Sequence, residues 1–373
     1  MTVLRPILLS LLLGLMLSGC SERDRPLDSP VTFEGDIFGT FYQVSISDPL
    51  TQGEAKELEE GFLAELEAVD AAMSTWRDDS ELMDLNRAPP GEWQSLSDPL
   101  IEVLAIGQSV SEASGGAFDM TIGDLVNLWS FGPEARPREV PDDAVLAERL
   151  ARIGPGSLEV DAEAGKARRL RDVFVDLSGV AKGHATDRVA TYLDGQKLDH
   201  YLVNLGGEVK VSGYRDAESA PWRIGIEVPR DGRPEAQHVF ALEDIALATS
   251  GDYRNYFEEQ GQRYSHTLDP RTGRPIEHRL ASVTVVHPSD VWADAWATAL
   301  LVLGEQEGMA LARERGLAVL MLARQGEGWT SLASPAFAER FGRATIDELD
   351  ELGVTVVDGT SDGMAADAGR PVE

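Results

Sequence analysis

The sequence predicts an α+β fold in which a strand-rich core of mixed or antiparallel pairing is flanked by helices. Helical periodicity occurs in residues 51–73 and again in residues 98–114, and short β-branched runs separated by turns dominate residues 201–287. Helical periodicity returns after residue 289, so helices stand on both sides of the strands along the chain. With 373 residues and 43% hydrophobic content, the chain can bury a sizeable core.

Two helices are predicted in the first part of the chain. Thr51 and Glu54 form a capping-box pattern at the start of the first one. Its apolar residues recur at steps of three and four: Leu58, Phe62, Leu66, Val69 and Met73. The second helix is predicted after Ser97 and ends at the glycine pair 115–116. We expect residues 115–133, "GGAFDMTIGDLVNLWSFGP", to form a loop.

The middle of the chain is predicted to form most of the strands. The segments are "YLVNLGGEVKVSG" (201–213), "WRIGIEV" (222–228), "HVFALEDIALATSG" (238–251) and "ASVTVVHP" (281–288). An earlier apolar run, "DVFVD" at 172–176, is also predicted to be a strand. After it, a helix is expected to begin near Lys182. Ser289 is expected to cap a helix over "DVWADAWATALLVLG", and "LAVLMLA" (317–323) is typical of a buried strand.

The N-terminus is typical of an export signal. Arg5 precedes an apolar run from Pro6 to Leu17, which is too short to span a bilayer stably. The run ends in "LSGC", which resembles a bacterial lipobox, and Cys20 is the only cysteine in the chain. We therefore expect lipidation of Cys20 and attachment to the periplasmic face of a bacterial membrane. The inner membrane is favoured, without excluding the outer one.

These signals divide the chain into four predicted segments. Residues 1–19 form the signal peptide and residues 20–34 a lipid-anchored tether, because "SERDRPLDSP" is polar and aperiodic. Residues 35–348 form the folded catalytic domain. Residues 349–373 form a C-terminal strand remnant and a flexible tail that is poor in large apolar residues.

The charge balance argues against nucleic acid as a partner. The chain has 33 basic and 64 acidic residues, a formal net charge of −31, and no basic stripe that could neutralise a phosphate backbone. A small polyanionic ligand would have to be bound locally, by backbone N–H groups, a few cations or a metal ion.

One candidate metal site lies in the helix predicted after Ser289. Asp294 and Thr298 are four residues apart, so they share one helix face and offer hard oxygen ligands. Magnesium needs few protein ligands and completes its shell with waters and phosphates. A solvated polar pair is the ordinary interpretation of this spacing, but the apolar neighbours Trp296 and Leu300 indicate a buried helix, where a lone carboxylate is costly.

Other features are consistent with an anion site. Asp176 and Lys182 flank the expected helix start, where free N–H groups favour an anion, although a plain helix cap would look the same. His266 is a candidate general base or ligand-orienting donor, although a histidine in a strand more often only satisfies its hydrogen bonds. Phe38, Trp76 and Phe118 are aromatic residues near glycine turns that could sandwich a planar ring or belong to the core. The chain has no Walker A loop, HExxH zinc motif, nucleophile elbow or dinucleotide fingerprint.

Taken together, several segments resemble the ApbE family, the FAD:protein FMN transferases. The segments are "FGTFYQV" (38–44), "MSTWRDDSEL" (73–82), residues 115–133, "DLSGVAKG" (176–183), "LVNLGGEV" (202–209), "TSGDYRNYF" (249–257), "SHTLDPRTGRPIEH" (265–278) and "ADAWATALLVLG" (293–304). The resemblance implies an ApbE-like, T-fold-related architecture. It also implies Mg²⁺-dependent transfer of FMN from FAD, as co-substrate, to a Thr or Ser hydroxyl of a respiratory electron-transfer subunit, with release of AMP.

The resemblance also implies roles for individual residues. Phe38, Trp76, Ala117, Phe118, Asp119, Asp176, Lys182 and Leu268 would contact FAD. The Gly179 carbonyl, Asp294 and Thr298 would hold the metal, and His266 would assist the attacking hydroxyl. Two other functions would use the same site: FAD storage without catalysis, and hydrolysis of FAD to FMN and AMP.

Overall fold

The protein is described here by a computed structural model that covers residues 22–356, apart from 135, 217, 228–235, 254, 327 and 352–353. The signal peptide, Cys20 and the tail after residue 356 lie outside the described residues. The helices are η1 (Glu22–Asp24), α2 (Gln52–Met73), α3 (Glu81–Arg87), α4 (Asp98–Ala113), α5 (Gly123–Leu128), α6 (Asp143–Leu150), η2 (Pro155–Ser157), α7 (Ala181–Gly195), α8 (Asp290–Arg315) and α9 (Pro335–Glu351).

A nine-stranded sheet forms the centre of the molecule. Its order is β1 (Val31–Ile37), β2 (Thr40–Ile46), β6 (Tyr201–Leu205), β7 (Glu208–Ser212), β10 (Ile245–Gly251), β15 (Leu280–His287), β16 (Ala318–Gln325), β17 (Gly328–Ala333) and β18 (Val354–Val356). Neighbouring strands are antiparallel except β17 and β18, which are parallel. The predicted α+β class with a mixed or antiparallel core is therefore confirmed.

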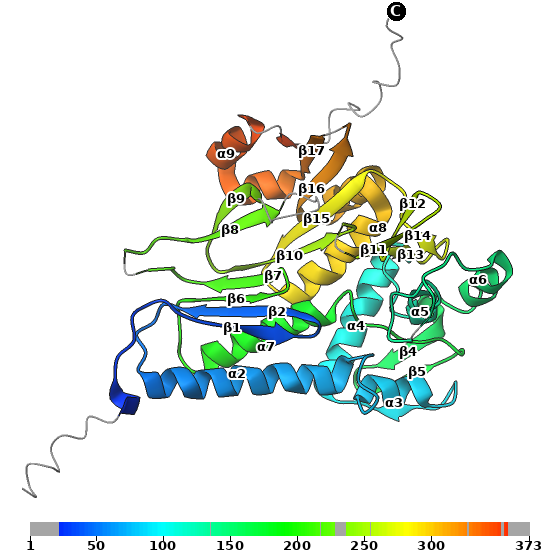
Figure 1. Cartoon of the computed structure of the whole chain (residues 1–373), viewed down its shortest axis with the longest axis horizontal. Coiled ribbons are helices and arrows are strands. Elements are labelled where there is room, and N and C mark those ends of the chain that lie inside the picture. The colour runs from blue at the N-terminus through cyan, green and yellow to red at the C-terminus, as the bar shows by residue number, and fades with distance from the viewer. Residues whose placement is uncertain are drawn as a thin grey trace, which may run out of the picture.

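Smaller sheets surround this centre. They are β3 (Gln94–Ser95) with β5 (Lys166–Arg169) and β4 (Leu158–Asp161), β8 (Trp222–Glu227) with β9 (Ala236–Leu242), β11 (Tyr256–Glu259) with β12 (Gln262–Ser265), and β13 (Leu268–Asp269) with β14 (Arg274–Pro275). Figure 1 shows the β8–β9 hairpin and α9 on one side of the large sheet and α2 and α7 on the other. The short strands β11–β14 lie beside α5 and α6.

Alternating side chains of the sheet supply two cores. Val203, Ala248 and Val283 face the helices α2, α7 and α8, whereas Leu202 and Leu247 face the β8–β9 hairpin and α9. Both faces of the sheet are therefore covered, and the strands are apolar on both sides.

The predicted helices follow their sequence signals closely. α2 has the expected capping box, in which Thr51 accepts the N–H of Glu54 and Glu54 accepts the N–H of Thr51, and its predicted apolar stripe is buried. α4 ends beside the predicted glycines. α8 begins after Ser289 as expected, but the Ser289 hydroxyl donates to Asp187 at 2.7 Å instead of capping its own helix.

Two local predictions were wrong. The segment "DVFVD" is not a strand, because only Phe174 forms a bridge, to Ile122. The Val175 N–H donates to the Asn86 side-chain oxygen at 2.7 Å, and the Val175 carbonyl accepts from the Asn86 side-chain nitrogen at 2.9 Å. The expected loop 115–133 contains α5, whose Leu125 is buried in a local apolar cluster. The first strand, β1, begins at Val31, and the predicted domain bounds stay predictions.

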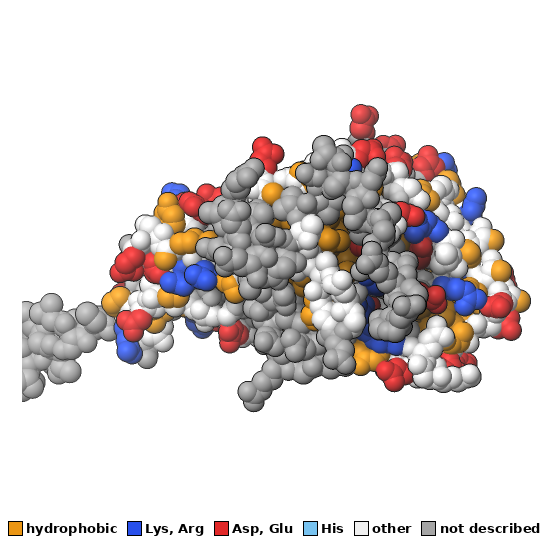
Figure 2. Space-filling view, turned by 90° about the horizontal axis from the view of Figure 1, so that it is seen from above, with side chains coloured by type: hydrophobic (Ala, Val, Ile, Leu, Met, Phe, Trp, Pro, Cys, Tyr) orange, Lys and Arg blue, Asp and Glu red, His pale blue; other side chains and the backbone are white. Residues whose placement is uncertain are grey.

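The surface agrees with the dispersed charge of the sequence. On the coloured part of the face in Figure 2, Lys and Arg side chains lie among Asp and Glu side chains and apolar atoms instead of forming one basic field. Among the helices of the described residues, none is both long and apolar enough to cross a membrane.

Candidate functional site

A cavity of about 870 Å³ opens where the large sheet splits between β7 and β10. The two strands pair only from Ile245–Val211 to Leu247–Val209, and β7 begins at Glu208. The second half of β10 therefore has β15 on one side and the cavity on the other. The split brings residues from most of the chain to one place, including Thr40, Asp176, Asn204, Ser250, Leu268 and Thr298.

The start of α7 supplies one wall of the cavity. The Asp176 carboxylate accepts the N–H of Ser178 at 2.7 Å, which closes a tight turn before the helix. This turn presents the Gly179 carbonyl and places Lys182 in the first turn of α7. Lys182 forms an ion pair with the buried Glu208, the first residue of β7. Burial lowers the pKa of Lys182, but the nearby carboxylates, Glu208 first and then Asp294, raise it, and the net shift is upward.

Close contact between α7 and α8 positions Asp294. The Gly183 N–H donates to the Asp294 carboxylate at 3.0 Å. A Cβ on Gly183 would lie 2.4 Å from the Asp290 carbonyl oxygen and 2.8 Å from Asp294 Cβ, so this approach requires glycine. Burial raises the pKa of Asp294 to about 7, with Lys182 opposing this and Glu208 adding to it.

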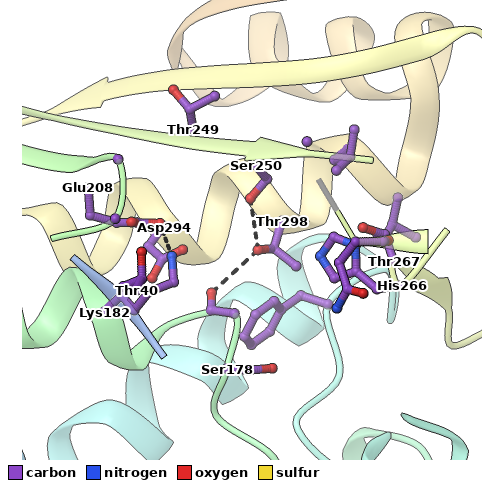
Figure 3. Close-up of a pocket in the computed structure, with 18 of the residues that line it drawn as sticks. Thr40, Ser178, Lys182, Glu208, Thr249, Ser250, His266, Thr267, Asp294 and Thr298 are labelled. Atoms are coloured by element: carbon purple, nitrogen blue, oxygen red, sulfur yellow. Dashed lines mark hydrogen bonds and ion pairs between the residues drawn. The ribbon is translucent and has the colours of Figure 1, made fainter. Parts of the chain in front are cut away.

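A set of oxygen atoms lies beside this carboxylate. The Thr298 hydroxyl is 3.5 Å from the Gly179 carbonyl and 3.1 Å from the Ser250 hydroxyl (Figure 3). A carbonyl, a hydroxyl and a buried carboxylate are hard donors of the kind that Mg²⁺ accepts, and a cation would compensate the buried charge of Asp294. The residues present therefore fit a magnesium ion. No group of three or more His, Cys, Asp or Glu side chains that could hold a metal occurs in the described part of the chain.

The His266 imidazole approaches the cavity from the connection between β12 and β13. Its Nδ1 lies 3.0 Å from the Asn255 carbonyl oxygen, and because a carbonyl can only accept, neutral His266 carries its proton on Nδ1. Nε2 is then the basic atom. Burial lowers the pKa of His266, so the neutral form persists below the usual pH. Figure 3 shows His266 and Asp294 on either side of Thr298 in that view.

The loop before α5 supplies another wall. Ala117, Phe118 and Asp119 line the cavity, and all three are buried. The Asp119 carboxylate accepts the N–H and the hydroxyl of Thr121, at 2.8 and 2.7 Å, so the loop is held in place by its own side chain. Burial raises the pKa of Asp119 despite these hydrogen bonds.

Most of the residues singled out in the sequence meet in this cavity. It is lined by Ala117, Phe118, Asp119, Asp176, Gly179, Lys182, His266, Leu268, Asp294 and Thr298. Phe38 and Trp76 are not among its lining residues: Phe38 packs against the main core, and Trp76 is 72% exposed after the end of α2. The proposed contact of these two aromatic residues with FAD stays a prediction.

Sequence reasoning missed several lining residues. Glu208 was part of the "NLGGEV" turn, but nothing in its spacing indicated an ion pair with Lys182. Ser250 and Thr249 belong to a strand, and only the unpaired half of that strand brings them to the cavity. The sequence feature that could have indicated them is the segment "TSGDYRNYF" (249–257), in which two hydroxyl residues and a glycine follow an apolar run.

The chain is similar in sequence to proteins of one known family. A model described as the ApbE family matches residues 38–321. The FAD:protein FMN transferase of Vibrio cholerae (O395) is 40% identical over 323 residues, which cover 87% of this chain and 95% of the relative. The one from Klebsiella pneumoniae (strain 342) is 38% identical over 328 residues, or 86% and 93% of the two chains.

Solved structures agree with this assignment. The flavin transferase ApbE from Vibrio cholerae has a TM-score of 0.76 and 39% identity, over 84% of this chain and 99% of that chain. The apo form of the flavinyl transferase ApbE from Pseudomonas stutzeri has a TM-score of 0.76 and 37% identity, over 85% and 98%. With its fold and most of its length shared with these proteins, this chain belongs to the ApbE family.

Proposed function

We propose that this protein transfers FMN from FAD to the hydroxyl of a Thr or Ser residue in an acceptor protein, with AMP as the other product. The observation that carries the proposal is the meeting, in one cavity, of the Gly179–Asp294–Thr298 oxygens, Lys182 and His266. Family membership supports it, since the relatives are named FAD:protein FMN transferases.

A magnesium ion held by the Gly179 carbonyl, the Asp294 carboxylate and the Thr298 hydroxyl would neutralise pyrophosphate oxygens as they gain charge. Lys182 would add positive charge on the same side, with Glu208 fixing its position. Asp176, Leu268 and the residues 117–119 would hold FAD in the orientation that exposes one phosphorus to attack.

The chemical step is a single displacement at phosphorus. The acceptor oxygen bonds to the phosphorus of the FMN half while the bond from that phosphorus to the bridging oxygen breaks, and AMP leaves with that oxygen. The hydroxyl proton passes to Nε2 of His266, which is basic because Nδ1–H is held by the Asn255 carbonyl.

The N-terminal signal supports a cellular location for this reaction. A chain lipidated at Cys20 and exported to the periplasmic face of a bacterial membrane would meet flavin-carrying subunits of respiratory complexes. The tether expected over residues 20–34 would leave the catalytic domain near that surface.

One experiment distinguishes transfer from FAD storage and from FAD hydrolysis. The full chain is incubated with FAD, Mg²⁺ and a purified respiratory flavoprotein subunit that was produced without flavin. Intact mass spectrometry of the subunit and chromatography of the nucleotides follow. A subunit heavier by FMN, with an equal amount of AMP, supports the proposal. Free FMN with an unmodified subunit would indicate hydrolysis, and intact FAD would indicate binding alone; either result contradicts transfer.

A further inference from the structure

The second half of β10 is a strand edge that opens into the cavity. Its last residue paired with β7 is Leu247, whereas pairing with β15 continues to Gly251. Thr249, Ser250 and Gly251 all line the cavity. β10 is an inner strand of the nine-stranded sheet, but along these residues only its edge toward β15 is paired, and the other edge faces the cavity.

The hydrogen-bonding pattern shows which groups face the opening. The Asp252 N–H donates to the Ala281 carbonyl at 3.0 Å, and this pair continues the register of β10 with β15. In an antiparallel ladder only alternate residues bond to a given neighbour, so Ser250 and Ala248 bond to β15. Thr249 and Gly251 direct their N–H and C=O groups to the other side. Among the described residues, none pairs with those groups.

Space is present in front of this edge. Gly206 and Gly207, in the turn that ends β6 and begins β7, line the cavity opposite β10. A Cβ on Gly207 would meet no heavy atom within 4 Å. Beside them, Ile224 and Ile226 of β8 form an apolar wall.

We propose that Thr249 and Gly251, the open edge of β10, bind the acceptor protein as one added antiparallel strand, with the modified threonine opposite Ser250. The inference rests on the proposed function, because it names how the acceptor is held. A polypeptide is the occupant that the geometry favours, since N–H and C=O groups repeated every second residue match another backbone in extended conformation. The antiparallel direction continues that of β7 along the same edge.

This register accounts for delivery of the hydroxyl to the reacting groups. Residues directly opposite one another in a sheet point to the same face. Figure 3 shows the Ser250 side chain directed to Thr298 and the Thr249 side chain on the other side of β10. A threonine opposite Ser250 would therefore point to the Thr298 side of the cavity. The residues before and after it would lie opposite Gly251 and Thr249 and face the apolar wall of β8.

The test uses the full chain with FAD, Mg²⁺ and either the whole respiratory flavoprotein subunit or a short synthetic peptide of its modified segment. In three further peptides, one amide is replaced by an ester, which removes a single N–H. The N–H of the residue before the threonine and that of the residue after it should bond to β10, whereas that of the threonine points away and is the matched control. We expect about a tenfold loss of kcat/KM at each flanking position and less than a threefold loss at the threonine.

A second measurement probes the register from the enzyme side. In a Cys20→Ser background, Thr249→Cys should form a disulfide with a peptide carrying cysteine directly after the position of the threonine. Opposite residues lie within the Cα separation that a disulfide needs. A peptide with cysteine in place of the threonine should not form it, because that side chain points to the other face.

The outcomes separate this inference from the proposed function. Equal losses at all three ester positions, or no loss at any, contradict strand addition while transfer itself stands. Modification of the whole subunit but not of the unaltered peptide also contradicts it, because recognition then requires a folded surface. FAD left intact with both substrates contradicts the proposed function and this inference with it.

Discussion

The two sides of the cavity are built by different means. Lys182, Asp294 and Thr298 project from α7 and α8, which pack so closely that Gly183 lies against the backbone of α8. His266 instead belongs to a connection between two short strands, and its ring is oriented by the single carbonyl of Asn255. The charged side is thus coupled to the core of the protein, whereas the His266 side can be altered with little effect on folding. Each prediction below tests this difference.

The largest effect is expected for Asp294→Asn. The amide oxygen can still accept the Gly183 N–H, but the charge that would hold a divalent cation is lost. We expect FMN transfer to fall by at least about 10³-fold, with the thermal unfolding midpoint nearly unchanged. Transfer is measured by the mass of the acceptor subunit over a range of Mg²⁺ concentrations.

The control for this variant is Asp290→Asn, one turn earlier in α8. Asp290 is fully buried, and burial together with Asp187 raises its pKa well above the usual range, so its charged form is disfavoured and asparagine is a close replacement. Its activity should stay close to that of the wild type. Similar losses in both variants would show that the charge of Asp294 has no special role.

Gly183→Ala tests the close packing on the charged side. The added Cβ would overlap the Asp290 carbonyl, so α7 and α8 must separate. We expect a loss of about 3 kcal/mol in the free energy of unfolding, measured by urea denaturation, together with weaker transfer. Gly195→Ala at the end of the same helix meets no atom within 4 Å and should leave both unchanged. A Gly183→Ala protein with normal stability would contradict the packing argument.

His266→Gln tests the other side. We expect transfer to fall by about 10²-fold, while the free energy of unfolding and FAD affinity remain close to those of the wild type. The rate is measured at saturating Mg²⁺, because a bound cation keeps Asp294 ionised although burial raises the pKa of that carboxyl to about 7. Since burial lowers the pKa of His266, the wild-type rate should then decline only as the pH falls below about 6.5. The variant should lack this acid limb in its pH–rate profile. A persisting limb would assign the proton transfer to another group.

The smallest effect concerns a second histidine, on the helical side. Burial lowers the pKa of His184 to about 4, so the folded protein binds its proton less readily than the unfolded chain. Stability should therefore fall as the pH decreases from about 6.5 towards 4, by up to about 1.4 kcal/mol per pH unit from this group. His184→Gln should reduce that slope in urea unfolding at several pH values. An identical slope in both proteins would show that His184 contributes nothing to it.

Features that depend on nearby residues could be predicted from the sequence, whereas features that depend on distant partners could not. α2, α4 and α8 carry apolar repeats and terminal signals that depend only on nearby residues. α2 and α4 were placed correctly, and α8 begins where predicted but continues past Gly304 to Arg315. The "DVFVD" segment has strand-like composition, but its pairing is decided by Asn86, which lies far away in the sequence. Among site residues, Asp294 and Thr298 share a helix face and could be paired from spacing alone. Glu208 could not, because its partner Lys182 comes from a different element.

The pairing of β2 with β6 has a consequence for how the protein acquires its activity. Tyr42 of β2 lies opposite Leu205 of β6, and the cavity, which opens between β7 and β10, is also lined by Thr40 of β2, Asn204 of β6 and Thr298 of α8. Contacts between segments that are distant in the sequence carry a loop-closure cost, which slows their formation. A nascent or truncated chain that ends before α8 would lack Asp294 and Thr298, so the site would stay incomplete until most of the chain has been synthesised.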